Sequence, residues 1–412
     1  MSVSSAGDGV GWLAVPGVLR EPDYRRLWAS GLFVNVARWM DLVTLGWLAL
    51  ELTGSPFMVG VAAFARSAPL MVVGPFAGIV ADRMPRGGVL VVAQATGVAT
   101  ALALAALFGT GRGGYRTLVA LEVVFGLVWA LDFPARRTSL YALLGASRVA
   151  QAVSLETVSM QIAKILGPLA AGFCLARLGP EASFALMAAT YAGGLAASSG
   201  LHRRLGGPAG TTAPTVAASM RAGLRAAWAS PTVRAVLLVT VAMNTLFFPY
   251  QHMLPVFARD VLAVGPVALG GLVAADGFGA LVGALVIASR RGQLPHRAIF
   301  GGAVLLAPVL LVGLAGLRWF PACVVLLVLI GAAESGFAAM QSTLVLLAAP
   351  DRVRGGAMGI LSACIGTQPL GTLAIGVLAA GAGAPAAFAV NAATALLVIV
   401  PLAWPLVRGR PD

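Results

Sequence analysis

The chain has 412 residues, of which 59% are hydrophobic and only 10% are charged, and its mean hydropathy is +0.91. These values exclude a soluble globular domain and indicate a multi-pass membrane protein. The net charge of +13 would suit a nucleic-acid partner, but no polar segment is long enough to fold as a separate basic domain. We therefore expect contact with membrane lipid and no nucleic-acid binding.

Apolar runs long enough to cross a bilayer follow one another along the whole chain. A membrane-spanning helix needs about 20 such residues, and this criterion predicts twelve spans. They cover residues 27–50, 57–81, 88–108, 117–134, 151–176, 182–201, 233–255, 267–289, 298–317, 321–347, 356–380 and 385–407. The predicted fold class is an all-α membrane protein with twelve transmembrane helices in two six-helix halves.

Basic residues are distributed unevenly between the predicted loops. Most of the 28 fall before residue 27, after residue 407, or in alternate loops such as 82–87 and 202–232. Because positive residues are retained on the cytoplasmic face, this pattern predicts cytoplasmic termini and a bacterial inner-membrane location.

A polar segment at 202–232 divides the chain into two similar parts. Leu27 and Val233 open corresponding spans, which indicates an internal repeat of six spans. Met220, Leu224 and Trp228 share one face of a predicted amphipathic helix in this segment. The expected organisation is an N-terminus (1–26), a first half (27–201), a linker (202–232), a second half (233–407) and a tail (408–412).

Six charged residues lie inside the predicted spans: Arg38, Asp41, Arg66, Lys164, Asp276 and Glu334. Intramembrane charges are costly and usually face a partner or a watery cavity, so they mark a candidate site. Asp41 is expected to pair with Arg38 or Arg66, and Lys164 to join their cluster in the first half. Asp276 and Glu334 have no obvious local cation, and with Asp41 they are the candidate proton carriers. Three cavity cations would suit an anionic or zwitterionic cargo.

The junction of the second and third spans reads Gly78-Ile-Val-Ala-Asp82-Arg83-Met-Pro-Arg86. This sequence resembles the loop signature of the major facilitator superfamily, although Pro85 stands where the superfamily usually has glycine. Asp132-Phe133-Pro134-Ala135-Arg136 and Ile165-Leu166-Gly167-Pro168 resemble the enterobactin-exporter-like, drug-efflux branch. The resemblance covers essentially the whole chain and implies proton-driven export of siderophores or drug-like molecules.

The resemblance also implies a latch on the cytoplasmic side. Asp82 could face the N-terminus of the span that begins near Gly356, while Arg83 and Arg86 could reach Asp132. The expected latch residues are Gly78, Asp82, Arg83, Arg86, Asp132 and Arg136.

Further candidate residues are polar or conformational. Gly167, Pro168 and Gly172 resemble the antiporter motif of exporters and predict a bend at the contact between halves. Neutral hydrogen-bonding residues that could line a cavity are Asn244, Tyr250, Gln251, Gln341 and Gln368. Glu122 is expected to reach water near the outer end of its span, and His252 to lie at the outer edge.

Motifs for other mechanisms are missing from the sequence. Cys174, Cys323 and Cys364 have no metal-ligand spacing, and no phosphate-binding glycine loop is present. We therefore expect no cofactor, no metal and no enzymatic activity. The predicted function is proton-coupled export of a small molecule by a monomer, through rocking of the two halves. Alternatives are an uptake symporter or lysophospholipid flippase of the same fold, and a non-transporting membrane sensor or scaffold.

Overall fold

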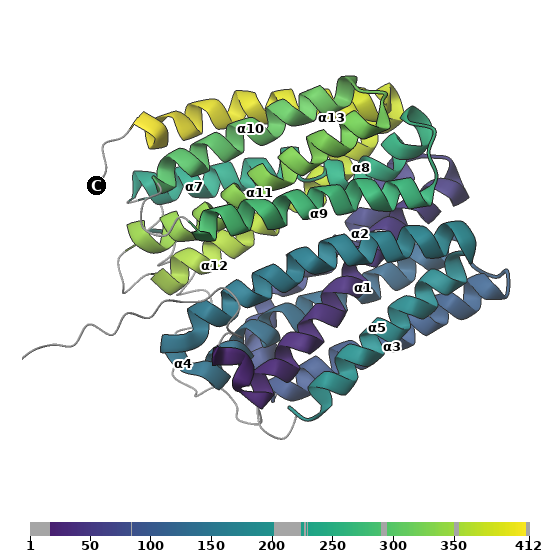
Figure 1. The fold of residues 1–412 in the computed structure, drawn as a ribbon, viewed down its shortest axis with the longest axis horizontal. Helices are drawn as coiled ribbons and strands as arrows, with labels where there is room; N and C mark the ends of the chain where they lie inside the picture. Colours follow the sequence, from purple (N-terminus) through teal and green to yellow (C-terminus); the bar gives the residue numbers. More distant parts are fainter. Residues whose placement is uncertain are drawn as a thin grey trace, which may run out of the picture.

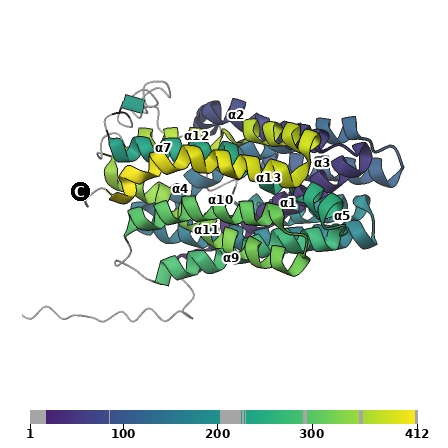
Figure 2. The same cartoon turned by 90° about the horizontal axis from the view of Figure 1, so that it is seen from above.

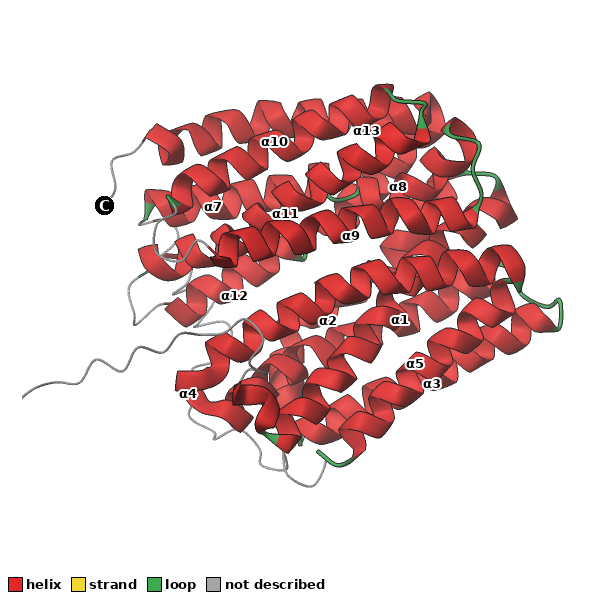
Figure 3. Cartoon of the chain, in the orientation of Figure 1, coloured by secondary structure: helices red, strands yellow, loops and turns green. Residues whose placement is uncertain are grey.

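The computed structural model describes residues 17–83, 85–201, 224–225, 228, 230–289, 295–349 and 354–408, without the side chains at 73–83, 141, 146–147, 150, 354–355 and 405–408. Within these ranges the backbone is helical apart from short turns, and no strand is present (Figure 3). A short 3-10 helix, η1 (Gly17–Arg20), precedes the first long helix.

Five long helices form the first bundle: α1 (Pro22–Thr53), α2 (Pro56–Arg83), α3 (Arg86–Gly109), α4 (Tyr115–Arg177) and α5 (Pro180–Ser199). Proline occupies the first position of three of them, where its missing N–H has no intrahelical partner to lose. α4 is interrupted at Gly145, whose φ of 67° is accessible to glycine without steric cost. This break divides α4 into two arms, each long enough to cross a membrane.

The second bundle begins with a segment of mixed helix types: α7 (Pro231–Ala242), the π-helix η2 (Met243–Phe247), α8 (Tyr250–Val256) and the π-helix η3 (Phe257–Val261). The remaining helices are α9 (Pro266–Ser289), α10 (His296–Gly316), α11 (Phe320–Ala348), α12 (Arg354–Ile365) and α13 (Gln368–Arg408). α13 is interrupted at Gly383, with φ of 80°.

These helices supply the predicted number of spans. Among the described residues, nine helical segments are long and apolar enough to cross a membrane, and one of them, Gly356–Trp404, folds back at Gly383. Because the folded segment counts as two spans, the nine segments provide ten. α2 and the 20-residue α5 bring the number to twelve. The all-helical, twelve-span fold class predicted from the sequence is therefore confirmed.

The helices are arranged as two bundles side by side, with α1 to α5 in one and α7 to α13 in the other (Figure 1). The view turned by 90° shows helices of both bundles running along a common direction (Figure 2). The start of α1 and the end of α13 lie at the same end of the molecule, which we call the terminal end (Figure 1).

Glycines allow the two bundles to approach closely at the opposite end. A Cβ on Gly60 of α2 would lie 3.0 Å from the Cα of Gly376 in α13, and one on Gly46 of α1 would meet Pro255 of α8. Side chains at these positions would hold the helices apart, so small residues permit the contact. Toward the terminal end the ribbons of the two bundles diverge (Figure 1).

The span limits differ from the predictions by a few residues. α1 begins at Pro22 rather than residue 27, and the seventh span continues to Val261 rather than residue 255. Helix ends are defined by capping and turn geometry as well as by hydropathy, so polar first turns extend beyond the apolar run. The predicted amphipathic helix at 216–230 lies mostly outside the described residues.

Candidate functional site

Arg66 of α2 connects two buried acids of the first bundle. Its guanidinium Nε forms an ion pair with Asp41 Oδ2 of α1 and lies 3.3 Å from Glu122 Oε2 of α4. Glu122 is completely buried and Asp41 nearly so. Of the two partners expected for Asp41, the structure selects Arg66. We call Asp41, Arg66 and Glu122 the first-bundle cluster.

Arg38 makes a different kind of contact. Its guanidinium carbon lies 3.9 Å from the ring centroid of Trp129 in α4, a cation–π arrangement, and 6.0 Å from the ring of Trp39. No carboxylate in the described part of the chain forms an ion pair with Arg38. This arginine is therefore the member of the six predicted charges that has no counter-charge among the described residues.

The other three charges meet between the bundles. The ammonium of Lys164, on the second arm of α4, lies 3.0 Å from Asp276 Oδ2 of α9 and 3.0 Å from Glu334 Oε2 of α11. All three side chains are buried, with exposed fractions of 5%, 1% and 7%. We call Lys164, Asp276 and Glu334 the interbundle triad, because one member comes from the first bundle and two come from the second.

Two neutral residues of α8 bind the acids of the triad. The Tyr250 hydroxyl contacts Glu334 Oε1 at 3.0 Å and Asp276 Oδ2 at 3.1 Å. The Gln251 amide donates to Glu334 Oε1 at 3.2 Å and to Asp276 Oδ2 at 3.3 Å. Both residues follow the end of η2 and the turn at Pro249, so the break in the seventh span presents them to the triad.

Glycines bring the triad helices close together. A Cβ on Gly277 of α9 would lie 3.0 Å from the backbone of Lys164, and one on Gly331 of α11 would collide with the carbonyl of Asp276. These close crossings bring short side chains such as Asp276 within reach of partners on neighbouring helices. In the first bundle, Gly126 makes the same kind of crossing against the carbonyl of Arg66.

Three predictions about the buried acids are wrong. Asp276 and Glu334 are not isolated, because Lys164 pairs with both across the bundle interface. Lys164 accordingly does not neutralise acids of the first bundle. Glu122 does not reach water but is buried against Arg66. Each error concerns a partner more than 55 residues away in sequence, or the rotation of a helix, which hydropathy does not specify.

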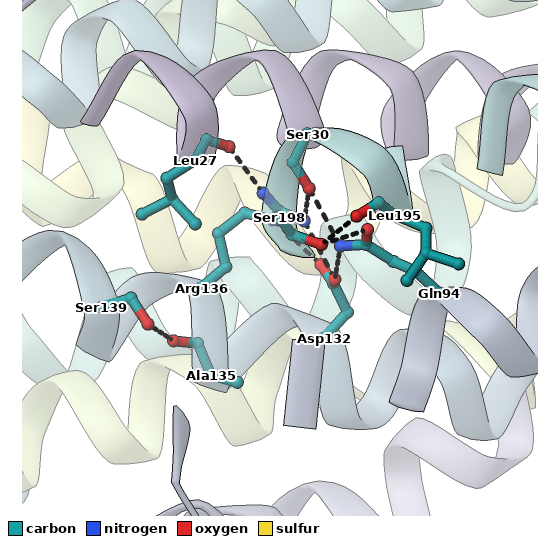
Figure 4. A network of polar contacts seen from close by, with 9 residues as sticks. All are labelled: Leu27, Ser30, Gln94, Asp132, Ala135, Arg136, Ser139, Leu195 and Ser198. Atoms are coloured by element: carbon teal, nitrogen blue, oxygen red, sulfur yellow. Dashed lines mark hydrogen bonds and ion pairs between the residues drawn. The ribbon is translucent and has the colours of Figure 1, made fainter. Parts of the chain in front are cut away.

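The predicted latch residues Asp132 and Arg136 form a buried network within the first bundle (Figure 4). Arg136 donates to both Asp132 carboxylate oxygens at 2.9 Å and to the Leu27 carbonyl at 2.8 Å. Gln94 of α3 donates to Asp132 and accepts from Ser198 of α5. The network therefore joins α1, α3, α4 and α5.

This arrangement changes the expected pairing of the latch. Asp132 was expected to receive Arg83 or Arg86, but the described carboxylate contacts are with Arg136 and Gln94, and Arg86 forms none with it. Arg136 lies four residues after Asp132 on the same helix, so a local pair satisfies the acid. The side chains of Asp82 and Arg83 lie outside the described residues, as do residues 350–353 before α12, so this part of the predicted latch, with Gly78 in α2, stays a prediction.

The antiporter-like segment lies in the contact between helices. A Cβ on Gly167 would meet the backbone of α1 at Val36, whereas one on Gly172 would collide with the carbonyl of Pro266 in α9. Pro168 stays inside α4 with its carbonyl against Gly270. The segment thus packs tightly on both bundles.

The remaining predicted polar residues lie in two places. Asn244 donates to the Thr240 carbonyl, and the Thr240 hydroxyl donates to Gln341 of α11, so these residues connect neighbouring helices of the second bundle. Gln368 is half-buried at the start of α13. His252 is also half-buried and lies next to Gln251.

Twelve membrane spans in two bundles, with ionisable residues buried at the contact between them, are the architecture of a multi-pass membrane transporter. The sequence profile of the family described as "Transmembrane secretion effector" matches residues 16–409. The chain belongs to this family, a branch of the major facilitator superfamily.

Known proteins agree with this assignment. The chain is 27% identical to the multidrug efflux pump Tap of Mycolicibacterium fortuitum over 92% of this chain and 95% of that protein. It is 23% identical to the staphyloferrin A transporter of Staphylococcus aureus over 40% of this chain and 41% of that one. A crystal structure of a bacterial homologue of the human lysosomal transporter Spinster, inward-facing and unoccupied, superposes with a TM-score of 0.67 at 14% identity, covering 95% and 96% of the two chains. That likeness concerns the fold.

Proposed function

We propose that this transporter is a proton-coupled exporter of small organic molecules in a bacterial inner membrane, with both termini in the cytoplasm. Its two bundles would rock about their contact and expose a central site to each side in turn. The observation that carries the proposal is the interbundle triad, in which a cation of one bundle binds two acids of the other.

The charge balance of the triad supports proton coupling. Lys164 contributes one positive charge, while Asp276 and Glu334 contribute two negative charges when both are ionised. One added proton would therefore neutralise the set. Because buried uncompensated charge is unfavourable, binding or loss of that proton changes the free energy of keeping Lys164 between the two acids. A proton that alters contact between the bundles gives the two states different stabilities, as coupling requires.

The first-bundle cluster is a second candidate for proton binding. Asp41 and Glu122 share Arg66, and Asp41 Oδ1 and both carboxylate oxygens of Glu122 are buried without a hydrogen-bond partner. This cluster is contained in one bundle, so its ionisation would not by itself alter the contact between bundles. We therefore assign the coupling step to the triad.

The arrangement of charges weakens the sequence-based argument for an anionic cargo. Arg66 and Lys164 are each neutralised by two acids, so Arg38 remains as the one predicted cavity cation without a described counter-charge. The relative named as a multidrug pump matches nearly the whole chain, and this supports drug-like molecules as the cargo class. The shorter match to a staphyloferrin A transporter is the reason to include siderophores, beside drugs, in the panel of compounds tested for transport.

Transport in inverted membrane vesicles tests the proposal. Vesicles that contain the protein, with an acidic interior, should accumulate ethidium, and a protonophore should release it. Glu334→Gln should abolish this gradient-driven accumulation while leaving the protein in the membrane. Glu21→Gln is the matched control, because Glu21 pairs with Arg148 at a site where both side chains are about half exposed.

If the protein were an uptake symporter, it would instead carry ethidium out of the vesicles together with the protons that leave their acidic interior. Equal accumulation by Glu334→Gln and the parent chain would remove the triad from the coupling mechanism. Absence of gradient-driven flux for every drug and siderophore in the panel would contradict export and favour a sensor or scaffold.

A further inference from the structure

The seventh span contains two π-helices that the transport mechanism above does not use. η2 and η3 flank the short helix α8. In η2 the Phe248 N–H bonds to the Met243 carbonyl, five residues earlier. In η3 the Leu262 N–H bonds to the Phe257 carbonyl in the same way. Each π-turn holds one residue more than an α-turn, and π-turns inside α-helices are found mostly at functional sites.

Two prolines explain why α8 is set apart from the helices around it. Pro249 and Pro255 have no N–H, so the carbonyls four residues earlier lose their α-helical donors. Glycines on the neighbouring helices leave room for the altered backbone. A Cβ on Gly371 of α13 would collide with the Thr245 carbonyl of η2. A Cβ on Gly46 of α1 would collide with the Pro255 ring.

The first turn of α8 is held by the acids of the interbundle triad. The Tyr250 hydroxyl contacts Glu334 and Asp276 at 3.0 and 3.1 Å, and the Gln251 amide donates to the same two acids. A shift of one residue in helical register corresponds to a rotation of about 100°. Conversion of η2 into α-helix would therefore turn α8 and withdraw both side chains from the acids.

The other end of this segment is fastened to the first bundle by Arg259 of η3. Its guanidinium donates to the Leu50 carbonyl of α1 at 2.9 Å, and Asp260 accepts from its Nε at 2.7 Å and so orients it. Leu50 lies in the last turn of α1, where the helix dipole favours a cation. This turn is at the end of the molecule opposite the terminal end (Figure 1). We call the Arg259–Leu50 contact the clasp.

We propose that α8 is a relay that connects the interbundle triad to the clasp. Tyr250 and Gln251 fix the rotation of α8 while they bind the acids, and this rotation directs Arg259 toward α1. When the contacts with the acids are lost, the π-turns convert to α-helix, α8 turns, and Arg259 leaves the Leu50 carbonyl. The relay rests on the proposed rocking of the two bundles, but not on the coupling ion or the direction of transport.

Thiol labelling of the full chain in nanodiscs at constant pH tests the clasp, without a gradient or a cargo. The native cysteines are replaced by alanine, Thr372→Cys reports on the buried contact with α2, and Phe133→Cys reports on a partly exposed position of α4. Arg259→Gln should raise the labelling rate at residue 372 by about tenfold, the size expected when one charge-assisted hydrogen bond is lost. It should lower the rate at residue 133, because opening one end closes the other.

Arg318→Gln is the matched control for the clasp. Arg318 also donates to carbonyls at a helix end, those of Ala315 and Leu317, but within its own bundle. This variant loses the same kind of contact without releasing one bundle from the other. Neither labelling rate should change.

Pro249→Ala tests the π-helix directly. Alanine supplies the missing N–H and lets η2 become α-helical, so the labelling rate at residue 372 should rise several-fold and the rate at residue 133 should fall. Pro308→Ala is the control, because Pro308 is also buried inside a helix, α10, but in a span described as α-helix throughout. It should leave both rates unchanged.

A double-mutant cycle tests the connection between the two ends of the relay. Tyr250→Phe removes the hydroxyl that contacts the acids and keeps the ring packed on Phe247 and Phe388. Alone, it should raise the labelling rate at residue 372. Combined with Arg259→Gln, it should add little, because the clasp is already open in that variant.

Three results would contradict the relay, each measured on variants that elute as monodisperse proteins. Equal rates at residue 372 in Arg259→Gln and Arg318→Gln would mean that the clasp does not hold the bundles together. Independent, multiplicative effects of Tyr250→Phe and Arg259→Gln would mean that the two ends of the segment act separately. Rates at residues 133 and 372 that rise together in Arg259→Gln would contradict the rocking itself, which distinguishes a failure of the proposed function from a failure of the relay.

Discussion

Buried charges in this protein are compensated in sets rather than in simple pairs. Arg66 has two acids, Lys164 has two acids, and Arg136 binds one acid together with a backbone carbonyl. Removal of the cation leaves the acids of a set buried with unbalanced charge, and that effect exceeds the loss of the contact itself. Stability measurements on single residues can therefore separate these sets from exposed ion pairs.

The Asp132–Arg136 network provides the first stability prediction. Asp132→Asn keeps the shape of the side chain but leaves the buried Arg136 guanidinium without its counter-charge (Figure 4). We expect a loss of about 3–5 kcal/mol, the usual cost of breaking a buried pair. Thermal unfolding in detergent should show it as a lower midpoint. Glu21→Gln, which removes an exposed pair with Arg148, should cost less than about 1 kcal/mol; similar midpoints for both variants would argue against a structural role for the network.

The triad predicts that a second substitution relieves the first. Lys164→Gln leaves Asp276 and Glu334 close together without a cation, so this variant should be strongly destabilised. Adding Glu334→Gln removes one of the two acids, and the double variant should unfold at a higher temperature than Lys164→Gln alone. Additive destabilisation in this double-mutant cycle would mean that the two residues do not interact.

At the scale of helices, the sequence predicted the spans well because one physical property, about 20 consecutive apolar residues, determines them. It also identified the six intramembrane charges as a candidate site, because such charges are rare in spans, whereas Asp132 and Arg136 were identified from the resemblance to a known family. It did not predict that Lys164 pairs with Glu334, 170 residues away. That contact depends on the rotation and crossing of α4, α9 and α11, which small residues set through packing.

Two adjacent glycines of α9 test the role of helix crossing. A Cβ on Gly270 would collide with the Pro168 carbonyl of α4, whereas one on Gly271 would have no heavy atom within 4 Å. Gly270→Ala should therefore destabilise the protein by about 1–3 kcal/mol through overpacking and should slow transport. Gly271→Ala should be neutral or stabilise it by up to about 1 kcal/mol, because alanine is the better helix former. The two variants are compared by their unfolding midpoints and by their transport rates in vesicles. Equal effects of the two substitutions would mean that α4 and α9 need no close contact.

At the scale of the whole molecule, the tight contact between the bundles and their divergence occur at opposite ends. Gly60 and Gly376 hold α2 and α13 together away from the terminal end, while the bundles diverge toward it (Figure 1). The triad lies along the α4–α9 contact that joins the bundles. If the bundles rock as rigid bodies, opening one end must close the other, and the two ends should respond in opposite directions.

Single cysteines provide a measurement of this reciprocity. In a chain with Cys174, Cys323 and Cys364 replaced by alanine, Phe133→Cys marks a partly exposed position on α4, and Thr372→Cys marks a fully buried position against Gly60. In the conformation described, a thiol reagent should label residue 133 rapidly and residue 372 slowly. Each labelling rate is divided by that of free cysteine at the same pH, since the loss of thiolate at low pH slows every thiol. If a proton on the triad alters the contact between bundles, as proposed, changing the pH from 8 to 5.5 in nanodiscs should move the two normalised labelling rates in opposite directions. The same shift in Glu334→Gln should be much smaller, since one of the two acids is gone. Rates that rise or fall together would contradict rocking and indicate a general change in protein flexibility.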